Sequence, residues 1–304
     1  MVKPFDNRNQ LTGMPQMAEI PFDLQVRLVR RALRRLMQMF RFRRFNLRGV
    51  PRFFANSFPK SGTHLLTQAL QGFPRLGPVV DSGLPAVVTY EGDTGRERTF
   101  KEILKDLRRL LPGDISYGHL HALPEVIDFL RQDGYATFFI LRDPRDVVIS
   151  HVHYVTDLEP RHALHKYYWE ELHNFDERLS VSIKGLPEIG FEFPDIRQRF
   201  EPFMGWMTCS EVMILRFEDF IANRIVTLGK VIDYAVERGF PLEMDKEEAI
   251  SVLASNIDPQ RSPTFRSGKA GGWRNQFTPH HKKLFKEITG DLLIRLGYEQ
   301  TDDW

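Results

Sequence analysis

Short apolar runs alternate with amphipathic stretches along much of the chain. The runs are rich in aromatic and β-branched residues and too short for buried helices, so they predict buried strands. These runs are residues 52–58, 135–141 and 212–215. Each is followed by a stretch with helical spacing, at residues 64–71, 146–154 and 220–238. The alternation predicts an α/β fold with a doubly wound, mostly parallel sheet flanked by helices.

The N-terminal part has a different pattern. Residues 1–22 are rich in proline and show little periodicity, whereas residues 24–45 follow helical spacing. One face of that helix is apolar, with Val29, Leu33, Leu36, Met37 and Phe40, and arginines fill the other face. A break at residues 46–51 follows. We therefore expect a basic N-terminal appendage at residues 1–50 and a single domain at residues 51–304.

Composition narrows the class of protein. The 304 residues are 42% hydrophobic, enough for a large core, which excludes wholesale disorder. A single cysteine, Cys209, excludes a disulfide framework and cysteine-based metal sites. Neither an apolar run long enough to span a membrane nor a secretory signal pattern is present, so we expect a cytoplasmic protein. Residues 24–80 hold 12 Lys and Arg and no acid, which invites a search for an anionic ligand or surface.

The first candidate site is the segment Phe58-Pro-Lys-Ser-Gly-Thr63, between a predicted strand and a predicted helix. Backbone N–H groups and the helix dipole at such a turn bind phosphate-like anions. Lys60 adds a charge, Ser61 and Thr63 add hydroxyls, and Gly62 permits close approach. A nucleotide triphosphatase would need the pattern G-x-x-x-x-G-K-[ST], which this segment lacks. A plain turn with an incidental lysine is the alternative.

Two further segments have the composition of anion sites. Residues 142–150 begin with Arg142 at the end of a buried strand and reach Ser150 in the following helix. An ordinary ion pair of Arg142 with Asp143 or Asp146 is the alternative there. Residues 265–278 combine glycines, cations and a tryptophan, as in a loop that closes over an anion. A solvated basic loop is the alternative for that segment.

Together, the three segments resemble the cytosolic-type sulfotransferase family, in a bacterial-like form, from about residue 52 to residue 298. The resemblance implies a P-loop-like turn that binds the donor 3′-phosphoadenosine 5′-phosphosulfate (PAPS). The residues it assigns to the donor are Lys60, Ser61, Gly62, Thr63, His64, Arg142, Ser150, Arg266, Ser267 and Gly268. The chain departs from the family pattern at Leu65, at Ser267 and at Gly272, and no family dimerisation motif is recognisable after Phe277.

The resemblance also places the catalytic base. The segment Ser116-Tyr-Gly-His-Leu120 resembles the family segment with the catalytic histidine, which makes His119 the expected base. His121 lies two residues further and could share the same face of an extended segment. Lys60 is expected to stabilise negative charge on the bridging oxygen of the donor. No metal is expected, because the ten histidines and the carboxylates lack ligand spacing.

The predicted function is therefore PAPS-dependent sulfuryl transfer to a hydroxyl by in-line displacement, which leaves adenosine 3′,5′-bisphosphate (PAP). The acceptor, a small molecule, glycan or lipid, stays open, and residues 82–100 and 156–200 are candidates for its pocket. Two alternatives are a P-loop-like nucleotide kinase or triphosphatase, which lacks its loop pattern here, and a non-catalytic nucleotide-binding protein.

The basic helix has two interpretations. Its apolar stripe could dock on the domain, whose residues 81–304 carry a net charge of −9. Docking is favoured because surface helices usually bury their stripe against their own domain. Peripheral membrane contact through residues 24–48 is the alternative, since a basic amphipathic helix suits an anionic interface. Nucleic-acid binding is not expected, because no reading module is recognisable.

Overall fold

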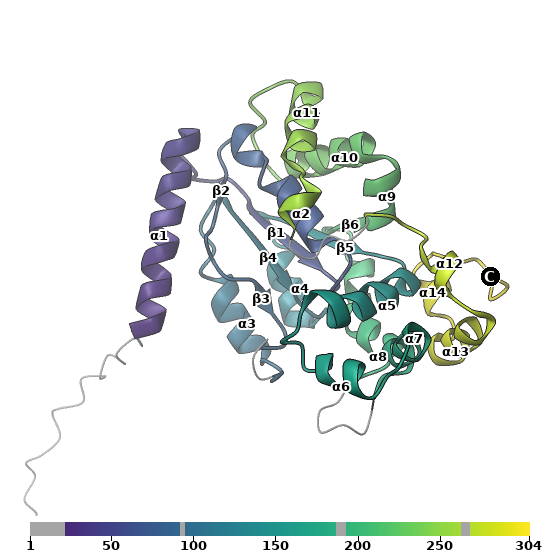
Figure 1. Ribbon diagram of the computed structural model, residues 1–304. Coiled ribbons are helices and arrows are strands. Elements are labelled where there is room, and N and C mark those ends of the chain that lie inside the picture. The colour runs from purple at the N-terminus through teal and green to yellow at the C-terminus, as the bar shows by residue number, and fades with distance from the viewer. Residues whose placement is uncertain (1–21, 92–94, 187–192, 263–267) are drawn as a thin grey trace, which may run out of the picture.

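A parallel sheet forms the centre of the molecule in the computed structural model, which describes residues 22–91, 95–186, 193–262 and 268–304 (Figure 1). The strands are β1 (Arg52–Ser57), β2 (Val80–Asp81), β3 (Val87–Val88), β4 (Asp114–His119), β5 (Tyr135–Leu141) and β6 (Met213–Arg216). Their order is β2-β4-β1-β5-β6, and the short β3 also pairs with β4. All the pairings between these strands are parallel, which confirms the predicted class.

Helices cover both faces of the sheet, so apolar side chains alternate along the strands between two cores. Phe53 and Phe138 pack into one core and Phe54 and Phe139 into the other. The α-helices are α1 (Phe22–Phe42), α2 (Thr63–Leu70), α3 (Phe100–Leu107), α4 (Pro124–Leu130), α5 (Pro144–His153), α6 (His165–Glu170), α7 (Phe175–Lys184), α8 (Ile196–Phe200), α9 (Phe217–Ala222), α10 (Arg224–Glu237), α11 (Lys246–Asn256), α12 (Trp273–Gln276), α13 (Pro279–Thr289) and α14 (Leu292–Arg295). Short 3-10 segments η1 (Phe73–Arg75), η3 (Glu201–Thr208) and η4 (Pro259–Arg261), and the single π-helical turn η2 (Tyr154–Leu158), join them.

The predicted elements recur with small shifts. The strand predicted at 135–141 is β5, and those at 52–58 and 212–215 are β1 and β6 within one residue at each end. The single helix predicted at 220–238 is wrong, because the chain leaves helical geometry at Asn223 (φ −140°, ψ 54°). Thr227 then donates a hydrogen bond to the carbonyl of Asp219, which fixes the corner between α9 and α10.

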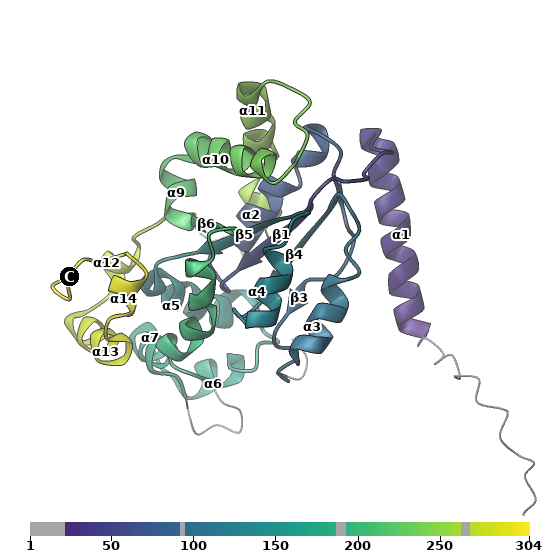
Figure 2. The same ribbon diagram turned by 180° about the vertical axis from the view of Figure 1, so that it is seen from behind.

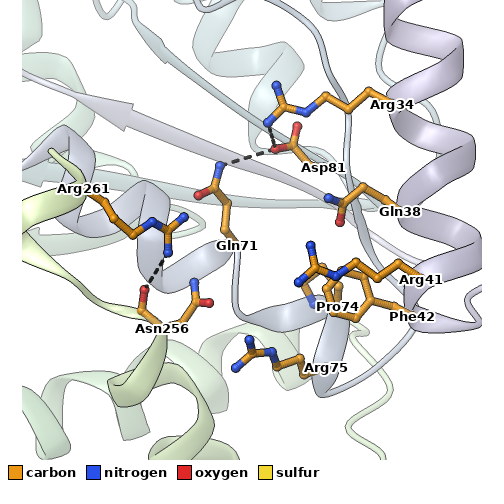
Figure 3. Close-up of a pocket in the computed structure, with 10 residues that line it drawn as sticks. All are labelled: Arg34, Gln38, Arg41, Phe42, Gln71, Pro74, Arg75, Asp81, Asn256 and Arg261. Carbon is orange, nitrogen blue, oxygen red and sulfur yellow. Dashed lines mark hydrogen bonds and ion pairs between the residues drawn. The ribbon is translucent and has the colours of Figure 1, made fainter. Parts of the chain in front are cut away.

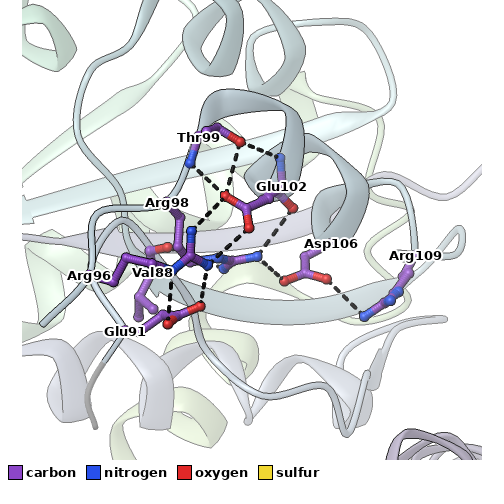
Figure 4. Close-up of polar contacts among 8 residues, drawn as sticks. All are labelled: Val88, Glu91, Arg96, Arg98, Thr99, Glu102, Asp106 and Arg109. Atoms are coloured by element: carbon purple, nitrogen blue, oxygen red, sulfur yellow. Dashed lines mark hydrogen bonds and ion pairs between the residues drawn. The ribbon is translucent and has the colours of Figure 1, made fainter. Parts of the chain in front are cut away.

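Helix α3 shows how local sequence fixes an element (Figure 4). Thr99 accepts a hydrogen bond from the backbone N–H of Glu102, whose carboxylate in turn accepts from the N–H of Thr99. This reciprocal cap satisfies two N–H groups that a helix start otherwise leaves open. Asp106, near the end of α3, accepts hydrogen bonds from Arg98 and Arg109.

Helix α1 lies along the β2 edge of the sheet in both views (Figures 1 and 2), and arginines make its polar contacts with the domain. Arg31 and Arg35 reach the two carboxylate oxygens of Asp114, at 3.1 and 2.7 Å, and Arg34 reaches Asp81 at 2.6 Å. Asp114 is completely buried, and a buried carboxylate is costly unless cations and donors surround it.

The prediction that α1 docks on the domain through its apolar stripe is therefore wrong. The requirement of Asp114 for cations holds the arginine face inward, and the opposite face of the same helix points away from the domain. Val29, Leu33, Leu36, Met37 and Phe40 are all exposed. Within the described residues, no helix has the length and apolar character needed to cross a bilayer.

Candidate active site

The segment 58–63 forms a tight turn between the carboxyl end of β1 and the start of α2. Lys60 and Gly62 both have positive φ, +66° and +96°. The left-handed region is costly for a lysine, and strain of this kind concentrates at functional sites. A Cβ atom on Gly62 would lie 2.8 Å from Cδ2 of Phe217, so only glycine fits. The turn therefore has the backbone shape of an anion site.

The two hydroxyl groups of this turn differ in their hydrogen bonds within the described residues. The Ser61 side chain is fully buried, and its Oγ has no hydrogen-bond partner among the described residues. An orphaned buried hydroxyl is costly unless a ligand or water satisfies it. The Thr63 hydroxyl lies 2.8 Å from that of Ser57. His64, also expected at the donor, is exposed on the first turn of α2.

Lys60 is partly buried, and its Nζ lies 3.5 Å from the centre of the Tyr154 ring. The pKa of Lys60 is lowered to about 8, mainly by burial and also by the positive charge of Arg142. Two cations held together in this way attract an anion. A bound negative charge compensates the hydration that Lys60 loses on burial and offsets its repulsion from Arg142.

His119 is the last residue of β4 and lies next to this turn. Its Nδ1 is 2.9 Å from the carbonyl oxygen of Ser57 and 3.1 Å from the Ser57 hydroxyl. Because a carbonyl can only accept, Nδ1 carries the proton in the neutral ring, which leaves a lone pair on Nε2. The Asn56 side chain holds the next residue, Leu120, at both its N–H and its carbonyl. The orientation of His119 is thus fixed from β1.

The electrostatic surroundings of His119 favour its neutral form. Burial is the largest cause of its lowered pKa, and the charges of His64 and Lys60 act in the same direction. The hydrogen bond from the ring to the Ser57 carbonyl opposes this shift. A neutral imidazole at physiological pH can accept a proton.

His121 lies in a different environment. Its ring packs edge-on against those of Tyr90 and Phe203, with centroids 5.3 and 4.9 Å away. Burial lowers its pKa to about 4. β4 ends at His119, so the extended segment that would have placed both histidines on one face does not continue.

Arg142 follows β5 and lies beside the same turn. Its guanidinium stacks over the Phe217 ring at 4.5 Å and donates to the carbonyl of Lys269 at 2.9 Å. It is also 3.4 Å from Asp146, so the ion pair considered from the sequence is present. Its Nε is nevertheless buried without a partner among the described residues. The ion pair with Asp146 therefore leaves part of the hydrogen-bond donor capacity of Arg142 unused.

Asp146 joins the second segment to the third. Its carboxylate accepts hydrogen bonds from the N–H groups of Gly271 and Trp273, at 2.7 and 3.0 Å. Gly268 is described at the start of this stretch (φ +59°), whereas Arg266 and Ser267 lie outside the described residues. Ser150 is partly exposed on α5. The structure thus brings parts of all three segments to the carboxyl edge of the sheet, where open α/β folds bind ligands.

Two neighbouring aromatic residues were not identified from the sequence. Phe217 packs between Gly62 and Arg142, and Tyr154 stacks on Lys60. Phe217 directly follows β6, and the rule that sites lie after parallel strands would have identified it. Tyr154 follows α5 and carried no comparable signal.

The aromatic residues of the two segments predicted for the acceptor pocket differ in their surroundings, although Tyr168 and Phe193 both contact the ring of His151. Tyr90 and Trp169 are exposed, and Phe193 stacks on His151. Tyr168 is buried, and its hydroxyl has no partner in the part of the chain that the structure describes. Tyr167 is partly buried, and Phe191 lies outside the described residues. Among the described residues, no three His, Cys, Asp or Glu side chains gather as metal ligands.

Comparison with known proteins identifies the family. Residues 137–297, more than half of the chain, match the sulfotransferase domain family. This chain belongs to the PAPS-dependent sulfotransferase family. The match includes Arg142, Ser150 and the segment 265–278, whereas the turn at 58–63 and His119 precede it.

Relatives of the sulfotransferase family match most of the chain. Flavonol 3-sulfotransferase of Flaveria bidentis is 25% identical over 276 residues, 80% of this chain and 82% of its own. Retinol dehydratase in complex with androsterone and the inactive cofactor PAP is 16% identical, with a TM-score of 0.54 over 84% of this chain and 85% of that one. A mouse sulfotransferase complexed with PAP is 18% identical, with a TM-score of 0.54 over 89% and 92%. These two structures share the fold.

Proposed function

We propose that this chain transfers the sulfuryl group of PAPS to a hydroxyl, with residues 51–304 as the catalytic domain and residues 1–50 as its appendage. The observation that carries the proposal is the arrangement of His119 beside the turn at 58–63. The ring is tied to Ser57 through Nδ1 and keeps Nε2 for a proton. Family membership supplies the chemistry for which this arrangement is suited.

The donor site consists of the turn and the Arg142 region. The N–H groups of the turn, Lys60, Ser61 and Thr63 bind the 5′-phosphosulfate, and His64 lies beside them. Arg142 and Ser150, with Arg266, Ser267 and Gly268, bind the 3′-phosphate. The unpartnered Ser61 Oγ and Arg142 Nε support this assignment, because a phosphate oxygen is the acceptor that each lacks. The PAP complexes of structural relatives are consistent with it.

In the reaction, Nε2 of His119 takes the proton of the acceptor hydroxyl while the hydroxyl oxygen forms a bond to the sulfur of PAPS. The bond between sulfur and the bridging oxygen of PAPS breaks, and its electron pair stays on the departing PAP. The Lys60 ammonium stabilises this developing charge. Protons and charge balance without a further reactant.

The acceptor is proposed to be a small hydroxyl compound. The names of the relatives point to this class: a flavonol, and the retinol and androsterone bound in retinol dehydratase complexes. Tyr154 and His162 are candidates for its pocket, because the Tyr154 ring lies against Lys60 and the His162 ring packs edge-on against Tyr154. Lipid and glycan hydroxyls are the other classes to include when acceptors are tested.

Two measurements test the proposal. PAP should raise the thermal unfolding temperature of the protein, and ATP with Mg²⁺ should not, because a ligand stabilises only the state it binds. Radiolabel from PAPS should then appear on a member of an acceptor panel, and a Lys60→Met variant of matched side-chain length should transfer far less. Stabilisation by ATP with Mg²⁺ alone would contradict the proposal.

A further inference from the structure

The outer face of α1 is an apolar stripe that nothing in the described chain covers. Leu33 and Met37, one helical turn apart, are 54% and 64% exposed. Val29, Leu36 and Phe40 continue the stripe along the helix, and Phe45 stacks edge-on against Phe40 beyond its end. Contiguous exposed apolar side chains on one face mark an interaction surface.

Cations lie beside this stripe. Arg30, Arg34 and Arg41 are exposed on the flank of α1, three or four residues from stripe positions. No Asp or Glu occurs from Leu24 to Val80, and of these three arginines only Arg34 has an acidic partner among the described residues, Asp81. The apolar stripe and the cationic flank thus form one amphipathic surface.

A cavity of about 310 Å³ lies where this flank meets the domain (Figure 3). Arginines from three elements line it: Arg34 and Arg41 of α1, Arg75 of η1 and Arg261 of η4. Arg34 is paired with Asp81, the one carboxylate in the lining. Among the described residues, no carboxylate lies within ion-pair distance of Arg41, Arg75 or Arg261. Three unpaired guanidinium groups around one cavity suit an anion such as a phosphate.

We propose that this surface binds an anionic lipid bilayer, with the α1 stripe in the interface and a lipid phosphate in the arginine cavity. A bilayer supplies both partners that the surface lacks: hydrocarbon for the stripe and negative headgroups for the arginines. A second copy of the chain fits less well. Pairing two α1 stripes would bring two arginine flanks together, and like charges there would repel each other.

The inward arginines keep this surface free. Arg31 and Arg35 bind the buried Asp114, so α1 cannot turn its stripe inward without leaving that carboxylate unpaired. The inference concerns where the protein resides and does not depend on the chemistry proposed above.

Co-sedimentation of the full chain with vesicles tests the proposal. The chain should bind phosphatidylserine-containing vesicles, bind phosphatidylcholine vesicles much less, and dissociate as salt rises. Leu33→Ser with Met37→Ser should weaken binding by roughly tenfold or more, because each side chain would leave the apolar interface. Arg75→Gln with Arg261→Gln should weaken binding to anionic vesicles and reduce the dependence on salt.

A matched control uses Ile225→Ser with Val226→Ser on α10, residues that are 57% and 59% exposed. This variant should bind vesicles like the parent chain, and all three variants should keep the circular dichroism spectrum of the parent chain, which reports an intact fold. The proposal is overturned if the parent chain ignores anionic vesicles, or if both serine pairs weaken binding alike. It is equally overturned if the Leu33 and Met37 pair instead abolishes a dimer seen in sedimentation.

Discussion

The turn at the carboxyl edge of the sheet and the inner face of α1 are both rich in cations, but the cations face different partners. Lys60 and Arg142 lie close enough to lower the pKa of Lys60, and Ser61 and Arg142 keep unpartnered polar atoms. On α1, Arg31 and Arg35 share one buried carboxylate, Asp114, and Nε of Arg31 also lacks a partner among the described residues. Arg142 also has a buried carboxylate, Asp146, so the two regions differ at Lys60. Lys60 has no carboxylate within ion-pair distance among the described residues, and such a cation at a tight turn indicates a ligand site, whereas Arg31 and Arg35 serve the fold.

The largest expected effect concerns the turn at the carboxyl edge of the sheet and its proposed base, His119. His119→Ala should lower turnover by roughly 10²- to 10⁴-fold, the usual contribution of a general base. Affinity for PAP should stay within a few-fold, because His119 is proposed to bind the acceptor proton and not the donor phosphates. Steady-state kinetics and calorimetric titration with PAP measure the two quantities.

His121→Phe is the matched control, since a phenyl ring can keep the edge-on packing against Tyr90 and Phe203. Its turnover should change little. Loss of turnover in this variant, with normal turnover in His119→Ala, would mean that the base is His121.

The second prediction concerns Asp114, the carboxylate that Arg31 and Arg35 share. Asp114→Asn should lower the free energy of unfolding by about 3 kcal/mol, because the substitution leaves two arginines facing a neutral amide. Denaturant titration of the full chain measures it. Asp106 is the control: it also binds two arginines (Figure 4), but its side chain is 29% exposed.

Asp106→Asn should therefore cost less than about 1 kcal/mol, as for other solvent-screened pairs. Equal costs at Asp114 and Asp106 would show that burial does not set the inward direction of the arginine face.

The third prediction concerns Arg142, whose Nε lacks a partner among the described residues. Arg142→Gln should weaken PAP binding by roughly 10- to 100-fold, since hydrogen bonds to charged groups contribute about 1.5–3 kcal/mol each. Adenosine 5′-phosphate, which lacks the 3′-phosphate, should lose far less affinity. Parallel calorimetric titrations with both nucleotides measure the difference, and equal losses would assign Arg142 to structure.

Features that adjacent residues determine could be predicted from the sequence, whereas features that depend on contacts with distant residues could not. β5 was predicted with its bounds because seven consecutive residues are buried on both faces, a pattern that few other elements produce. The turn at 58–63 was predicted because its chemistry lies in adjacent residues. Phe217 directly follows β6, so the rule on strand ends would have identified it, whereas Tyr154 reaches the site from the end of α5 and no local pattern indicated it. The direction of α1 depends on one buried carboxylate, Asp114, which the amphipathic pattern of the helix does not contain.

The smallest expected effect is the pH dependence of kcat/KM, which reports the free protein. The neutral form of His119 is the active one and its pKa is lowered, so activity should fall only as pH drops below 6.5. Lys60 acts as a cation with a pKa of about 8, so activity should also fall as pH rises through that value, by about tenfold per pH unit. Lys60→Arg keeps its charge at these pH values and should remove the alkaline limb while leaving the acid limb in place. An alkaline limb near 10 in the parent chain would mean that Lys60 is neither buried nor close to Arg142 in solution. The contrast between Lys60 and the paired arginines of α1 would then lose its electrostatic basis.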